Sequence, residues 1–107
     1  MANWKDVWKE AIDAAHGKLK SRAPEAQSQL GAIAEAHKKS LRALLSAFAD
    51  GKIDEQTLES ELADEKIVFE SDLLAVQTMT KKPAHDAANA FFDVIEQAAT
   101  TTLGGLL

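Results

Sequence analysis

Imidazole and carboxylate side chains are the groups in this sequence best able to bind a metal ion or move a proton. The chain has three histidines and no cysteine, which excludes thiolate ligands, disulfides and cysteine nucleophiles. Asp13 and His16 lie three residues apart, so they share one face of a helix that contains both. His37 falls on the apolar face of a second predicted helix. A metal-binding helical bundle that uses Asp13, His16 and His37, with zinc or iron, is therefore one of two functional hypotheses.

The Asp13-Ala14-Ala15-His16 segment resembles the ligand pairs of di-iron carboxylate proteins, which are four-helix bundles. Those proteins use two Glu-x-x-His pairs with further glutamates, whereas this chain has a single pair with aspartate in place of glutamate. Glu35 and His37 are two residues apart, about 200° around a helix, and cannot bind one ion together. A histidine on an apolar face more often has a hydrogen-bond partner or sets helix register. We therefore expect no cofactor, and the metal hypothesis ranks second.

Asp50-Gly51-Lys52-Ile53-Asp54 is the clearest turn in the sequence. It is similar to the middle of an EF-hand calcium loop, but the first, third and twelfth loop positions are Ser46, Phe48 and Thr57. Two anchoring aspartates and the bidentate glutamate are therefore missing. A helical hairpin explains the same residues, because glycine suits a helix C-terminus and aspartate suits the N-cap of the next helix.

Apolar residues recur at steps of three and four through four segments of the chain, which is the spacing of helices that bury one face. Asn3 is a suitable N-cap, and Pro24 and Pro83 suit the first turn of a helix. We predict helices over residues 3–20, 24–50, 54–80 and 83–100, with a flexible tail over 101–107. The predicted fold class is all-α. We expect residues 1–107 to form a single domain, a four-helix antiparallel bundle built on a long central hairpin flanked by two shorter helices.

The predicted lengths make the central hairpin longer than the helices that flank it. Helices of about 26 residues span roughly 39 Å, and the shorter helices would leave about 12 Å of the hairpin uncovered. Six apolar residues on this arm would then need a cover: Leu41, Leu44, Leu45, Phe48, Leu58 and Leu62. We expect a homodimer to supply it, with a different protein partner, or a flanking helix that tilts over the arm, as alternatives. The leading hypothesis is thus a non-enzymatic helical protein–protein interaction or assembly module.

Trp4 and Trp8 lie on the apolar stripe of the first predicted helix, with lysines nearby. This pattern fits core packing best, with a partner groove or a membrane surface as alternatives. Asp6, Glu10 and Asp13 share the polar face of that helix and would oppose an anionic lipid surface. We therefore predict that both tryptophans are buried in the core.

Charge is distributed unevenly along the chain, which has a net charge of -5. Residues 1–53 hold nine basic and six acidic side chains, whereas residues 54–72 hold one basic and eight acidic side chains. The negative total argues against a nucleic-acid partner, because duplex binding depends on cationic groups that neutralise phosphates. The sequence shows neither a secretory signal nor an apolar run of about 20 residues that a membrane span requires. We expect a cytoplasmic protein that does not bind membranes.

Overall fold

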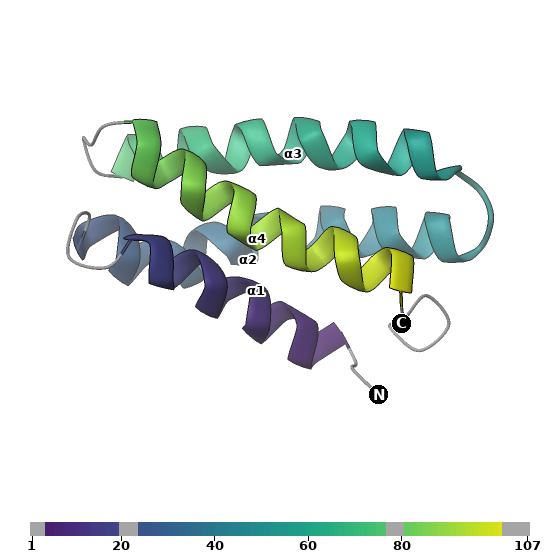
Figure 1. The fold of residues 1–107 in the computed structure, drawn as a ribbon, viewed down its shortest axis with the longest axis horizontal. Helices are drawn as coiled ribbons and strands as arrows, with labels where there is room; N and C mark the ends of the chain where they lie inside the picture. The colour runs from purple at the N-terminus through teal and green to yellow at the C-terminus, as the bar shows by residue number, and fades with distance from the viewer. Residues whose placement is uncertain (1–3, 20–23, 77–80, 102–107) are drawn as a thin grey trace.

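Four helices make up the regular secondary structure of the computed structural model, which describes residues 4–19, 24–76 and 81–101. They are α1 (Trp4–Leu19), α2 (Pro24–Ala49), α3 (Glu55–Val76) and α4 (Lys81–Thr101). Successive helices run in opposite directions (Figure 1). The all-α class and the four-helix antiparallel bundle predicted from the sequence are confirmed.

The helix ends agree with the prediction most closely where capping residues set them. α2 begins at Pro24 as predicted, and α3 begins just after the Asp54 cap. α4 begins at Lys81, two residues before the predicted start, and Pro83 still lies in the first turn, where a missing N–H breaks no helical hydrogen bond. Residues 20 and 77–80, and the predicted tail beyond Thr101, lie outside the described residues.

Hydrogen bonds at the end of α2 and at the start of α3 hold the turn between the two helices. The Gly51 N–H donates to the Phe48 carbonyl and the Lys52 N–H to the Ala47 carbonyl, which is the Schellman arrangement of a helix C-terminus. Gly51 has a φ of 75°, a left-handed conformation that costs a side-chain-bearing residue energy. On the other side, the Thr57 N–H donates to the Asp54 carboxylate at 2.8 Å, so Asp54 caps α3.

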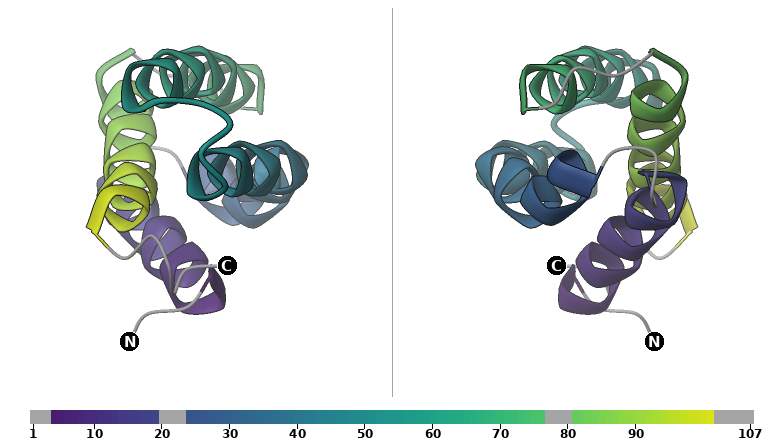
Figure 2. Two further views of the ribbon diagram at one scale, coloured as in Figure 1. Left: turned by 90° about the vertical axis from the view of Figure 1, so that its right-hand side faces the viewer. Right: turned by 90° about the vertical axis from the view of Figure 1, so that its left-hand side faces the viewer.

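Seen along its length, the bundle places the helices in the order α1, α4, α3, α2 around a common core (Figure 2). α1 packs most extensively against α4, and α2 packs against α3. α1 and α2 contact each other least among these neighbouring pairs. The central hairpin is therefore covered mainly by α4, which lies between α3 and α1.

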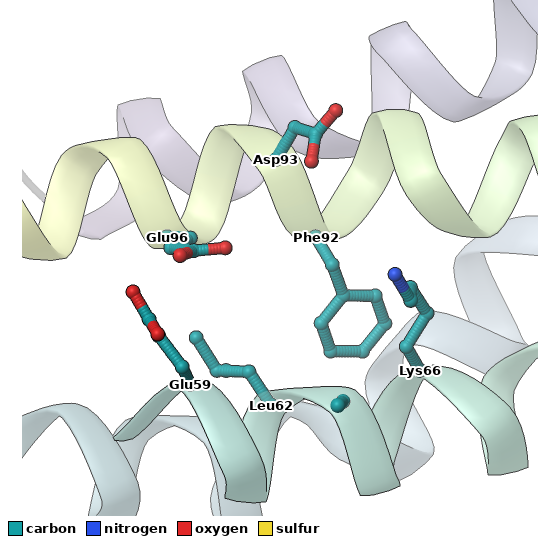
Figure 3. Close-up of a pocket in the computed structure, with 7 residues that line it drawn as sticks. Glu59, Leu62, Lys66, Phe92, Asp93 and Glu96 are labelled. Atoms are coloured by element: carbon teal, nitrogen blue, oxygen red, sulfur yellow. The ribbon is translucent and has the colours of Figure 1, made fainter. Parts of the chain in front are cut away.

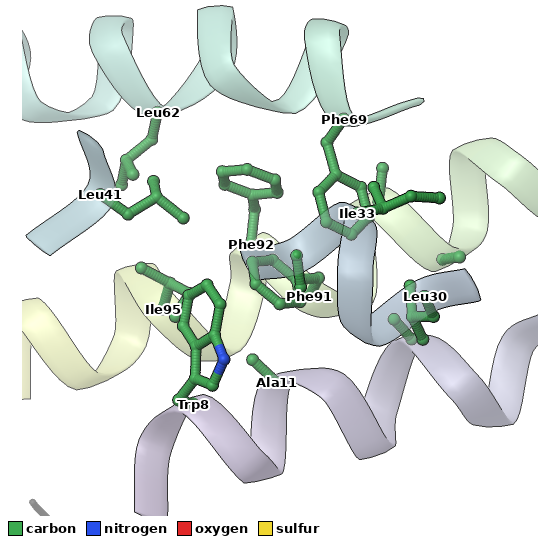
Figure 4. Close-up of a cluster of buried hydrophobic side chains, with 14 of the residues drawn as sticks. Trp8, Ala11, Leu30, Ile33, Leu41, Leu62, Phe69, Phe91, Phe92 and Ile95 are labelled. Carbon is green, nitrogen blue, oxygen red and sulfur yellow. The ribbon is translucent and has the colours of Figure 1, made fainter. Parts of the chain in front are cut away.

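Aromatic rings of α1, α3 and α4 meet in the core beside leucine and isoleucine side chains of α2 (Figure 4). Trp8 of α1 contacts Phe91 of α4 at 5.3 Å between ring centroids, and Phe91 stacks on Phe69 of α3 at 4.7 Å. Phe69 in turn lies 5.5 Å from the ring of His37 on α2. Trp4 and Trp8 are both buried, as predicted. These rings form one contact chain that crosses the whole bundle.

The hairpin is covered within a single chain over most of its length. α1, with 16 residues, is shorter than the 26-residue α2 as predicted, but α4 has 21 residues and is longer than expected. Leu45 of α2 and Leu58 of α3, both close to the turn, are buried. This is the alternative in which a flanking helix covers the arm.

Candidate functional site

His37 is the one buried polar side chain among the described residues, with 6% of its surface exposed, and it joins α2 to α3. Its Nδ1 lies 2.8 Å from Glu65 Oε2 and its Nε2 lies 2.9 Å from Asp72 Oδ2. Glu65 and Asp72 are seven residues apart on α3, so both carboxylates lie on the flank that faces α2. The Phe69 ring, between them in sequence, contacts the imidazole. His37 is therefore held on both ring nitrogens by acidic groups of one neighbouring helix.

The surroundings of Glu65 favour its ionised form. Burial raises the pKa of this carboxyl, but the hydrogen bonds from His37 and Ser40 outweigh burial and lower it. The Ser40 hydroxyl donates to Glu65 Oε1 at 2.7 Å. Because Ser40 bonds the carboxylate and not the imidazole, the cluster is not arranged as a serine–histidine–acid triad, in which the imidazole takes the hydroxyl proton.

The residues of the metal hypothesis are not gathered into one site. Asp13 and His16 are exposed on α1, whereas His37 is buried and turned toward α3. Within residues 4–19, 24–76 and 81–101, no group of three or more His, Asp or Glu side chains is placed to hold a metal ion. The metal hypothesis thus gains no support from the geometry.

The six predicted interface residues lie on the inner faces of the hairpin. Leu41, Leu45, Leu58 and Leu62 are buried in the core of the single chain. Leu44 and Phe48 are partly buried and pack against that core. Association through these side chains would compete with folding, so the structure directs attention to the outside of the hairpin.

The largest exposed apolar side chains in the described part of the chain lie on α3. Ile67 is 65% exposed and Val68 is 51% exposed, and Val76 is exposed near the end of the helix. Asp64 and Ser71 are exposed beside them. We call Asp64, Ile67, Val68 and Ser71 the outer α3 face. Its apolar residues contrast with a core that buries the other large side chains of the same helix, Leu58, Leu62, Phe69 and Leu73.

A hollow lies between α3 and α4 (Figure 3). Its cavity volume is about 60 Å³, far below the roughly 300–1,000 Å³ of typical small-molecule pockets. Leu62 and Phe92 line it, and Glu59 and Glu96 face each other across it. Two facing carboxylates and a shallow apolar floor make it a poor site for an organic substrate.

Sequence reasoning singled out His37 but missed its partners. An acidic run such as residues 54–72 usually forms a solvated face or pairs with nearby basic residues, here Lys38, Lys39 and Arg42. Lys38 instead lies over the Trp8 ring at 5.6 Å, and its carboxylate contact at 3.9 Å is to Glu35 of its own helix. The signal that identifies Glu65 is its distance from the turn, because His37 and Glu65 are each fourteen residues from Gly51.

A second histidine also bonds an acid of α3. His85 of α4 places Nδ1 2.8 Å from Glu70 Oε1, and 58% of the His85 side chain is exposed. Acids of α3 therefore meet histidines of both neighbouring helices, with the buried contact on the α2 side.

No family model matches the chain, and neither a curated protein nor a solved structure is significantly similar to it.

Proposed function

We propose that this chain is a non-enzymatic helical protein–protein interaction module, which self-associates through the outer α3 face and acts in the cytoplasm. The supporting observation is the exposure of Ile67 and Val68, neighbouring residues of one helix, beside a well-filled core. Exposed apolar patches of this kind often mark interfaces, because burying them removes apolar surface from water. No helix in the described residues has the length and apolar character needed to cross a membrane.

Charge favours a second copy of this chain as the partner. The outer α3 face includes Asp64, with Glu61 exposed one turn before it. α2 exposes Lys39 and Arg42. A two-fold dimer that lays the outer α3 face of each copy against α2 of the other brings these opposite charges together twice. The dimer would then pack four helices, two from each hairpin, side by side in the manner of a short coiled coil.

This proposal keeps self-association on the predicted hairpin but moves it from the inner to the outer surface. The inner leucines stabilise the monomer, and the outer face remains available to a partner. A single folded chain can therefore exist before it associates, so association should depend on protein concentration.

Sedimentation equilibrium across a range of concentrations tests the proposal. Wild type should show a monomer–dimer equilibrium, and Ile67→Glu/Val68→Glu should shift it toward monomer. Lys5→Gln/Lys9→Gln on α1 is the matched control, because it lowers the net charge by the same two units at exposed positions away from α3. That control should leave the equilibrium unchanged.

A charge exchange tests the orientation of the dimer. Lys39→Glu/Arg42→Glu should weaken association, and the addition of Glu61→Lys/Asp64→Lys to the same chain should restore it. A wild type that stays monomeric at every concentration, or a dimer that the Ile67→Glu/Val68→Glu variant leaves intact, would refute self-association through this face. Binding of a basic amphipathic peptide by a monomeric wild type would assign the face to a foreign partner.

A further inference from the structure

We propose that His37 is a proton-operated clamp between α2 and α3. With a proton on each ring nitrogen it ties both Glu65 and Asp72 to α2, and on losing one proton it releases Asp72. This inference concerns the stability of the hairpin and does not depend on self-association.

The geometry of the ring carries the inference. Each nitrogen of His37 lies within 3 Å of a carboxylate oxygen, and an ionised carboxylate only accepts hydrogen bonds. A neutral imidazole has one N–H and can satisfy one of the two acceptors. The doubly protonated ring donates to both, and its positive charge lies between two negative charges at a site with little access to water. The arrangement therefore fits the charged ring and not the neutral one.

The two carboxylates differ in what they lose when the ring becomes neutral. Glu65 is 25% exposed at its side chain and keeps a second donor, the Ser40 hydroxyl. The Asp72 side chain is 42% exposed, so water can replace the ring as its donor. The remaining ring proton should therefore stay on Nδ1, bonded to the less hydrated Glu65. The contact that breaks is therefore the one between His37 Nε2 and Asp72, which lies closer to the C-terminal end of α3.

The charged groups around the ring come from α3 and α2. From α3 these are Glu65 and Asp72, and on α2 the neighbouring Lys38 lies over Trp8 of α1. α4 approaches this region with Phe91 and Phe92, which contact Phe69. The two carboxylates are thus the charged groups nearest the ring, and each accepts a hydrogen bond from it only when the facing nitrogen carries a proton.

Thermal unfolding between pH 5.5 and 8.5 tests the clamp, because histidine is the side chain that ordinarily titrates in this range. A folded state that holds the second ring proton more tightly than the unfolded chain is most stable at low pH and loses that stability as the pH rises. The Tm of wild type should fall by about 4–8 °C across the range. His85→Gln should keep most of this fall, whereas Asp72→Asn should lose most of it.

Nitrogen NMR of the histidine rings tests the clamp without a variant. In the folded protein both ring nitrogens of His37 should remain protonated to a higher pH than in the same chain unfolded in urea. At the pH where the ring becomes neutral, the proton that remains should be on Nδ1. A His37 ring that loses its proton at the same pH folded and unfolded would overturn the proposal. So would a Tm that rises with pH in wild type, or a fall that Asp72→Asn leaves unchanged.

Discussion

His37 and Glu65 lie at equal distances from Gly51 along the two arms of the hairpin, and their side chains meet at 2.8 Å. The pairing shows how a turn in the sequence sets the register of two long helices. The left-handed Gly51 ends α2, the Asp54 cap starts α3, and residues equally distant from the turn face each other. A buried polar contact at this position favours one register over its neighbours, because a shift would leave a buried imidazole or carboxylate without its partner.

Truncating a buried apolar side chain should lower the free energy of unfolding much more than truncating an exposed one. Leu45→Ala leaves a cavity in the core and should lower the free energy of unfolding by about 2–5 kcal/mol. Val68→Ala, at a half-exposed position, should change it by no more than about 0.5 kcal/mol. Urea unfolding at several protein concentrations measures both and separates core packing from association. Equal losses in the two variants would contradict the burial seen here.

Replacement by alanine should change the stability of the protein in opposite directions at two of its glycines. Gly51→Ala forces a side chain into the left-handed conformation and should cost about 1–2 kcal/mol. Gly31→Ala, inside α2 with no atom within 4 Å of the added Cβ, should stabilise the protein by about 0.5–1 kcal/mol. Thermal unfolding of the two variants beside wild type provides the comparison. Destabilisation by Gly31→Ala would show that the outer surface of α2 is not open.

Removal of the Asp54 cap should lower the Tm at neutral pH. Hydrogen bonds from the Thr57 backbone N–H and hydroxyl lower the pKa of Asp54. The stability they provide is present above the ordinary pKa of aspartate and disappears as the pH falls through the lowered value. The Tm difference between wild type and Asp54→Ala should therefore shrink on acidification. Asp50→Ala, on the other side of the turn, is the control and should not reproduce this pattern.

Glu65→Gln should weaken the protein at neutral pH and flatten its response to acid. Because hydrogen bonds from His37 and Ser40 lower the pKa of Glu65 against the opposing effect of burial, ionisation of this carboxyl favours the folded state. Its contribution is complete above the ordinary glutamate pKa and is lost as the pH drops through the lowered one. We expect a loss of about 1–2 kcal/mol at pH 7 by urea unfolding. Glu61→Gln, exposed one turn earlier, should lose far less.

The fold was largely predictable because its signals are local. Caps, prolines and the apolar repeat determine where each helix begins, ends and buries its face, and these depend on residues a few positions apart. The coverage of the hairpin was less predictable, because it depends on the path of α4 over distant residues. That helix runs over residues 81–101 instead of the predicted 83–100, so it extends beyond the predicted segment at both ends.

The candidate site was predictable only in part. His37 stands out as a polar residue among apolar ones, but the acids that bind it follow from the register of the hairpin. The exposure of Ile67 and Val68 was missed for a similar reason. The stripe of Leu58, Leu62, Phe69 and Leu73 indicates which side of α3 faces the core, but the sequence does not show that Ile67 and Val68 on the other side stay exposed.

The ring contacts that run from Trp8 through Phe91 and Phe69 to His37 take one side chain from each helix. No helix can then detach without breaking at least one of these ring contacts. Partly opened forms, with three helices packed and one released, should be rare compared with complete unfolding, so the bundle should unfold as one cooperative unit. Hydrogen exchange of the amides near these four residues should therefore report the same opening free energy.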